Sequence, residues 1–207
     1  MLLIDQHPDN RSLMVSVLGA PNVGKSSLIN YLLGTDLSIV SHRPQTTRNR
    51  FHCILNVERT QLVFVDTPGL HKSNLELNRR INEQAREGVE GPDLNLLLID
   101  LTQGILQQFI DFQKLVERRL GPTWAVFTKS DQIEGAEGLP LDDVMEKAKE
   151  IIPSLERHFL LSSKTGENVE ELTKALCERA PEGAHHYTQD EISNRNERFF
   201  ATEYIRE

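Results

Sequence analysis

The residues Gly19–Ser26 (GAPNVGKS) have the types and the spacing of a loop that binds phosphate. They fit the pattern G-x-x-x-x-G-K-[ST], and they follow an apolar run and precede a helical pattern, as a P-loop requires. Backbone N–H groups of such a loop surround phosphate oxygens, and the positive end of the helix dipole adds to the attraction. The pattern directs Lys25 to the β- and γ-phosphates and the Ser26 hydroxyl to Mg²⁺. The expected contact residues are Gly19, Asn22, Val23, Gly24, Lys25, Ser26 and Ser27.

A second short motif, Asp66–Gly69 (DTPG), ends another apolar run. A carboxylate at Asp66 can hold Mg²⁺ through water, and the backbone N–H of Gly69 can contact a γ-phosphate. The pattern D-x-x-G is common, so it gains meaning only beside the P-loop. We therefore interpret Ser26 and Asp66 as a pair of magnesium-site residues.

Two further motifs could recognise a base. In Thr128–Asp131 (TKSD), the Asp131 carboxylate can accept hydrogen bonds from N1–H and N2–H₂ of guanine, and the Lys129 stem can lie along the base plane. In Ser162–Lys164 (SSK), the backbone N–H of Ser163 can donate to guanine O6. The expected base-site residues are Thr128, Lys129, Asp131, Ser162, Ser163 and Lys164.

These motifs sit at the ends of short apolar runs typical of strands buried on both faces of a parallel sheet. The runs are Leu13–Leu18, Leu62–Val65, Leu94–Ile99, Trp124–Phe127 and Phe159–Leu161. Helical patterns lie between them, at Lys25–Leu33, Leu75–Glu87, Gln107–Arg119, Asp142–Ile151 and Val169–Arg179. Arg50–Val57 and Gln61–Asp66 form a predicted hairpin. This order predicts an open α/β sheet with helices on both faces, whose motifs meet at the edge where such sheets bind ligands.

Composition excludes several classes of protein. Of the 207 residues, 31 are Asp or Glu and 23 are Lys or Arg, which gives a net charge of −8. That balance argues against a nucleic-acid-binding body and predicts no DNA partner. The two cysteines are too few for a disulfide framework and indicate a reduced, cytoplasmic setting. The sequence shows neither a signal peptide nor an apolar run of about 18 residues.

The chain changes character after Ala180. Pro181-Glu-Gly183 ends the last helical pattern, and a polar stretch leads to an amphipathic helix that begins near Arg198. The 27 residues from Pro181 to Glu207 are too few to form a core of their own. We therefore predict an N-terminal extension at residues 1–12, a main domain at 13–180, and a linker with the first element of a further domain at 181–207.

Taken in order, the motifs resemble those of the bacterial Era GTPases, in the TrmE–Era group of translation-factor-related GTPases. The resemblance runs from about Leu13 to Glu207. The matching segments are Gly19–Ser26, Pro44–Arg48 (PQTTR), Asp66–His71 (DTPGLH), Thr128–Asp131, Ser163–Val169 (SKTGENV) and Ile192–Glu207. It implies a P-loop NTPase G domain with a mostly parallel six-stranded sheet and one antiparallel edge strand. It also implies that residues 181–207 lead into a C-terminal RNA-binding KH domain.

The resemblance implies a function as well. The chain would bind GTP and GDP with Mg²⁺, hydrolyse GTP as a switch, and act with 16S rRNA and the 30S ribosomal subunit through the KH domain. Peripheral association with the inner membrane is also implied. Thr47 would complete the magnesium shell, with Thr46 as the alternative. The implied catalytic residues are Lys25, Asn22, Thr47 and Gly69, where Asn22 matches a P-loop Asn that helps to hold K⁺.

Two departures and two alternatives accompany this reading. Era proteins usually have Asn where Thr128 stands, so we expect weaker contacts between the base loop and the P-loop. The usual Ala of the last motif is Ser163, which keeps its backbone donor. A P-loop ATPase or kinase is one alternative function, although it leaves Asp131 unexplained. A nucleotide-gated binding module with negligible turnover is the other.

Overall fold

The computed structural model describes residues 7–35, 51–66, 91–116 and 120–194. The helices predicted at Leu75–Glu87 and from Arg198 onward lie outside the described residues.

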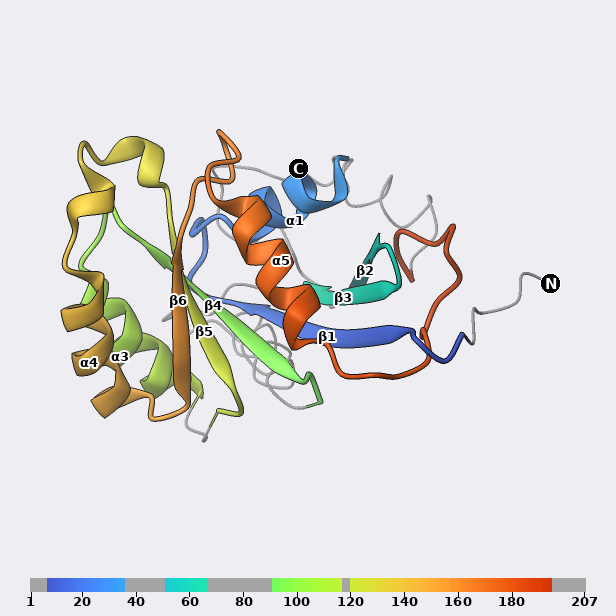
Figure 1. Cartoon of the computed structure of the whole chain (residues 1–207). Helices are drawn as coiled ribbons and strands as arrows, with labels where there is room; N and C mark the ends of the chain where they lie inside the picture. The colour runs from blue at the N-terminus through green and yellow to red at the C-terminus, as the bar shows by residue number, and fades with distance from the viewer. Residues whose placement is uncertain (1–6, 36–50, 67–90, 117–119, 195–207) are drawn as a thin grey trace, which may run out of the picture.

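A six-stranded sheet forms the centre of the molecule (Figure 1). Its strand order is β2-β3-β1-β4-β5-β6. The strands are β1 (Arg11–Leu18), β2 (Phe51–Val57), β3 (Thr60–Asp66), β4 (Leu94–Asp100), β5 (Thr123–Thr128) and β6 (Leu155–Leu160). β2 pairs with β3 in the antiparallel sense, and every other neighbouring pair is parallel. The predicted mostly parallel sheet with one antiparallel edge strand is therefore confirmed.

Helices cover both faces of this sheet (Figure 1). α1 (Lys25–Leu33) and α5 (Val169–Arg179) pack on one face, while α3 (Ile105–Val116) and α4 (Leu141–Ile151) pack on the other. β4 shows why, because Leu96 and Leu98 point into the first core and Leu97 and Ile99 into the second. Among the described residues, no helix is long and apolar enough to cross a membrane.

The strand β6 is longer than its apolar residues indicate. The sequence predicts a strand only at Phe159–Leu161, whereas β6 begins at Leu155. Glu156 and Arg157 are exposed because β6 is an edge strand. The Arg157 guanidinium lies 5.2 Å from the centre of the Trp124 ring, and Glu156 accepts a hydrogen bond from Trp124 Nε1. Charged side chains at an edge can pack in this way without being buried, so hydrophobicity alone does not reveal the strand.

Other elements also start one or two residues earlier than predicted, β1 and α3 by two. β1 begins at Arg11 and not at Leu13, and α3 begins at Ile105 and not at Gln107. Such differences of two residues are normal at the ends of helices and strands.

The segment after α5 runs back along the sheet. We call residues 181–194 the C-terminal strap. Its first part lies beside β1, where Gly183 N donates to Asn10 O at 2.9 Å. Its last part lies along the outer edge of β2, where Ile54 N donates to Ile192 O at 3.0 Å and Asn194 N to His52 O at 3.2 Å. The strap thus covers an edge whose backbone groups would otherwise be unpaired.

The side chain of Gln61 on β3 holds the middle of this strap. It is fully buried. Its Oε1 accepts hydrogen bonds from the backbone N–H groups of His186 (2.8 Å) and Tyr187 (3.0 Å). Its Nε2 donates to Tyr187 O and to Asn56 Oδ1, each at 3.0 Å. One amide therefore satisfies two donor groups and two acceptor groups, much as a neighbouring strand would.

We expect Gln61→Ala to lower the free energy of unfolding by about 3 kcal/mol, since it leaves several buried polar groups without partners. Urea denaturation measures the change, and amide hydrogen exchange at His186 and Tyr187 should accelerate with it. Gln189→Ala is the matched control, because the Gln189 side chain is exposed and only its carbonyl contacts the sheet. Equal stability of the two variants would contradict this role for Gln61.

Candidate nucleotide-binding site

The loop between β1 and α1 adopts a conformation that requires glycine at two positions. Gly19 has φ +142°, and a Cβ there would lie 2.8 Å from Leu98 O. Gly24 has φ +104° and directly precedes the first residue of α1. Asn22 also has a positive φ, of 60°, which Asn tolerates better than most residues. The backbone N–H groups of this loop therefore lie at the N-terminus of α1, the arrangement that favours an anion.

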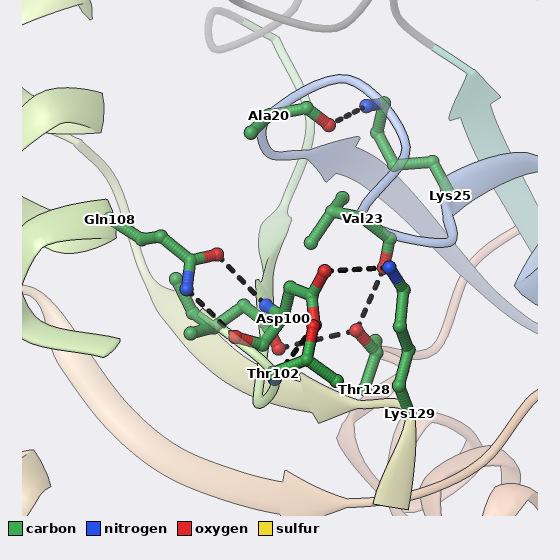
Figure 2. Close-up of polar contacts among 9 residues, drawn as sticks. Ala20, Val23, Lys25, Asp100, Thr102, Gln108, Thr128 and Lys129 are labelled. Atoms are coloured by element: carbon green, nitrogen blue, oxygen red, sulfur yellow. Dashed lines mark hydrogen bonds and ion pairs between the residues drawn. The ribbon is translucent and has the colours of Figure 1, made fainter. Parts of the chain in front are cut away.

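Lys25 is directed by the loop itself (Figure 2). The residue is only 8% exposed, and its Nζ donates to Ala20 O at 2.7 Å and to Gly19 O at 3.1 Å. The ammonium group is thus held over the P-loop backbone and not out in solvent. Ser26 follows in the first turn of α1, and Ser27 comes next.

Thr128 connects the base loop to the P-loop (Figure 2). Its Oγ1 donates to Val23 O at 2.7 Å and also lies 3.2 Å from Ile99 O. Gly24 lies beside both base motifs, because a Cβ on it would be 3.9 Å from Thr128 Cβ and 3.8 Å from Ser163 Oγ. The hydroxyl of Thr128 therefore makes the connection between the two loops, although it has no amide group.

Asp131 connects the two base motifs to each other. Ser162 Oγ donates to Asp131 Oδ1 at 2.6 Å and accepts from the N–H groups of Lys164 and Thr165, each at 3.2 Å. Ser130 Oγ donates to Glu167 Oε2 at 2.7 Å. Asp131 is exposed, so its carboxylate is oriented by Ser162 and remains accessible to a ligand.

The described residues thus bring most of the expected site together. Asp66 ends β3, where its backbone is in register with Val17 near the end of β1. The three motifs after β1, β5 and β6 share the same edge of the sheet. Thr46, Thr47 and Gly69 lie outside the described residues.

Sequence reasoning missed one charged residue at this edge. Asp100, the last residue of β4, accepts a hydrogen bond from Lys129 Nζ at 2.6 Å. Burial acts to raise the pKa of Asp100, but hydrogen bonds from Lys129 and Thr102 and the charge of Lys129 outweigh it and leave the pKa below its ordinary value. Asp100 is therefore ionised at neutral pH. Its position at the end of a fully buried, mostly apolar strand, at the ligand-binding edge, is the signal that could have identified it.

Comparison with known proteins agrees with this geometry. The family model described as 50S ribosome-binding GTPase matches residues 14–129. GTPase Era of Pseudomonas aeruginosa is 36% identical over 215 residues, which cover 99% of this chain and 68% of that protein. Fold and site together define a P-loop GTPase domain.

Two solved structures each match 95% of this chain, and the match covers 66% of the solved chain. One is Era in complex with MgGDPNP and nucleotides 1506–1542 of 16S ribosomal RNA, with a TM-score of 0.83 and 30% identity. The other is a variant of Aquifex aeolicus Era bound to GDP.AlF4⁻, with a TM-score of 0.84 and 33% identity. The chain belongs to the Era family of GTPases. It spans 63–66% of the length of other curated Era relatives that it matches.

Proposed function

We propose that this chain is a GTP-binding and GTP-hydrolysing switch. The observation that supports it most is the connection of three loops at one sheet edge, P-loop to Thr128 and Asp131 to Ser162. Phosphate contacts come from the loop before α1, and base contacts come from the loops after β5 and β6. Similarity to Era bound to MgGDPNP supports the same ligand class.

Guanine recognition is assigned to Asp131 and to the backbone of Ser163. A carboxylate accepts two hydrogen bonds from guanine N1–H and N2–H₂, and adenine offers no equivalent pair of donors. Lys129, Thr128, Ser162 and Lys164 shape this loop. A function as a P-loop ATPase would leave the orientation of Asp131 beside Ser162 unexplained.

The residues present fit a magnesium ion. Ser26 bears a hydroxyl in the first turn of α1, and Asp66, the last residue of β3, is a residue with a carboxylate group; both are oxygen ligands of the kind Mg²⁺ prefers. Thr47 would add a third oxygen. When bound, the ion neutralises charge on the β- and γ-phosphate oxygens. Lys25 would contribute a positive charge beside the same oxygens, and Gly69, which lies outside the described residues, would contribute a backbone donor.

Phosphate release from GTP and from ATP tests this function directly. We expect Mg²⁺-dependent release of phosphate from GTP and negligible release from ATP. Equal affinity for the two nucleotides would contradict guanine specificity. Tight GTP binding without any release would support instead a binding module gated by nucleotide.

Potassium is a further element of this proposal. In many switch GTPases a Gln after D-x-x-G orients the attacking water, and Leu70 stands at that position here. The unassisted rate should therefore be slow, on the order of 10⁻³ s⁻¹ or below. We propose that Asn22 helps to hold a K⁺ ion, and that the positive charge of this ion would assist hydrolysis in a chain that lacks the Gln.

We expect faster GTP hydrolysis in K⁺ than in Na⁺ at matched ionic strength. Asn22→Gly should abolish the difference and leave GDP affinity largely unchanged, because Gly keeps the left-handed backbone that Asn22 adopts. Asn22→Ala removes the same amide but adds backbone strain, so comparison of the two variants separates ion binding from loop geometry. Equal rates in the two salts would refute the role of K⁺.

The output of the switch is proposed from the family. We assign residues 13–180 to the G domain and 181–207 to a linker and the start of a KH domain that contacts 16S rRNA of the 30S subunit, in the cytoplasm or peripherally at the inner membrane. A KH domain clamps RNA with a G-x-x-G loop, and Gly183 is the only glycine after Ala180 in this chain. Residues 1–207 should therefore bind small-subunit RNA poorly. A salt-dependent complex of micromolar affinity would show that the G domain itself binds RNA.

A further inference from the structure

The carboxylate of Asp100 belongs to none of the nucleotide-binding motifs, yet it contacts one of them. Its Oδ2 lies 2.6 Å from Lys129 Nζ, and the two side chains are only 7% and 28% exposed (Figure 2). A short, charge-assisted hydrogen bond in such a setting is screened less by salt and water than a surface ion pair. The charged end of Lys129 is therefore anchored.

Asp100 is itself held in one orientation. Its Oδ1 accepts hydrogen bonds from Thr102 N at 2.9 Å and from Thr102 Oγ1 at 2.6 Å. Its backbone is bracketed by Gln108 of α3, whose Oε1 accepts from Asp100 N at 2.9 Å and whose Nε2 donates to Asp100 O at 2.8 Å. These bonds leave Oδ2 directed at Lys129 (Figure 2). The carboxylate is a rigid support.

The backbone of Lys129 is fixed as well. Its φ of 64° lies in the left-handed region, which costs about 1 kcal/mol or more for a residue with a Cβ. The preceding Thr128 is bonded to the P-loop, and the following loop is bonded through Asp131 to Ser162. With both its backbone and its ammonium group held, the four-carbon stem between them has little freedom. A lysine side chain otherwise carries about 2 kcal/mol of rotamer entropy.

We propose that Asp100 is a positioning residue for nucleotide binding, which holds the Lys129 ammonium so that the side-chain stem presents a fixed apolar face to the purine base. The inference rests on the proposed function, because it requires a base beside the loop Thr128–Asp131. Asp100 positions the Lys129 stem that packs on the face of the base, whereas Asp131 accepts hydrogen bonds from the edge of the base. Asp100 therefore raises affinity without setting the choice between guanine and another purine.

The test uses Asp100→Asn, Lys129→Met and the double variant in the full chain, with GDP affinity as the readout. Asn keeps the acceptor for Thr102 and removes the charge, while Met keeps an apolar stem and removes the anchored ammonium. Each single variant should bind GDP about tenfold more weakly, and the double variant should be no weaker than Lys129→Met. Additive losses in the double variant would overturn the inference, because they would show that Asp100 does not act through Lys129.

Thr102→Val is the matched control. It removes the Oγ1 hydrogen bond to the same carboxylate but keeps the one from Thr102 N, so Asp100 should stay directed at Lys129 and GDP affinity should stay within about twofold of the unaltered chain. In an Asp131→Asn background, Asp100→Asn should lower affinity for xanthosine diphosphate by the same factor as for GDP in the unaltered chain. If the Asp100→Asn chain is too unstable to assay, Lys129→Met remains as the test. Unchanged GDP affinity in that variant would contradict a role for the anchored Lys129 ammonium in nucleotide binding.

The outcomes also separate this inference from the proposed function. An unaltered chain that binds ADP as well as GDP would contradict the proposed function. A chain with strong preference for GDP whose Asp100→Asn variant binds GDP with unchanged affinity would contradict only the positioning role of Asp100.

Discussion

Asp131→Asn should convert the site from a preference for guanine nucleotides to a preference for xanthine nucleotides. The carboxylate is expected to accept two hydrogen bonds from guanine, and hydrogen bonds to charged groups contribute about 1.5–3 kcal/mol each. Losing both should weaken GDP binding about a hundredfold or more. The amide of the replacement can donate to the C2 oxygen of xanthine, so affinity for xanthosine diphosphate should rise. Competition binding with GDP, xanthosine diphosphate and ADP measures all three.

The structure makes this substitution a fair test. Ser162 Oγ donates to Asp131 Oδ1, and an amide oxygen at that position can accept the same bond. The link between the two base motifs therefore survives, and the fold should be unaffected. Asp143→Asn on α4 removes a carboxylate from an exposed position outside these motifs, and it should leave all affinities unchanged. A variant that still prefers GDP would show that Asp131 does not read the base.

Lys25→Met should remove most nucleotide binding and nearly all hydrolysis. The Lys25 ammonium is held at the P-loop by Gly19 O and Ala20 O, where it would meet the β- and γ-phosphates. Its loss should weaken GTP binding about a hundredfold, and turnover should fall by a further ~10²–10³ because charge that develops on the phosphate oxygens loses a preorganised cation. Equilibrium binding and single-turnover phosphate release measure the two effects separately.

The stability of the same variant is a useful contrast. Met has nearly the volume and shape of the lysine stem, so the free energy of unfolding should change by about 1 kcal/mol or less. Lys174→Met, at an exposed position on α5, controls for the loss of one positive charge and should bind GTP as the unaltered chain does. Unchanged GTP binding by Lys25→Met would mean that the loop before α1 is not the phosphate site.

The sequence by itself determined the architecture and where most of the candidate site residues stand in it. Local patterns carried that information. β4 and β5 are apolar along nearly their whole length because both of their faces are buried, and α1 and α5 were predicted at their observed bounds because their apolar spacing is regular. The P-loop was recognisable because its glycines meet local requirements, a positive φ at Gly24 and a close approach to Leu98 at Gly19. The candidate site residues Lys25, Thr128 and Asp131 lie at or after the carboxyl ends of strands, which a parallel sheet brings to one edge.

Only the tertiary structure decided which side chains support those residues. Asp100 and Lys129 are 29 positions apart in the chain, and Gln61 is more than 120 positions from the strap that it holds. Neither pairing leaves a periodic signal in the sequence. The first depends on strands β4 and β5 lying side by side, and the second depends on the strap returning to β2 and β3. β6 was underestimated for a related reason: its charged residues are tolerated because it is the last strand of the sheet. The order of the strands in the sheet decides which residues are neighbours, and therefore which groups a polar side chain can contact. No short sequence pattern contains that order.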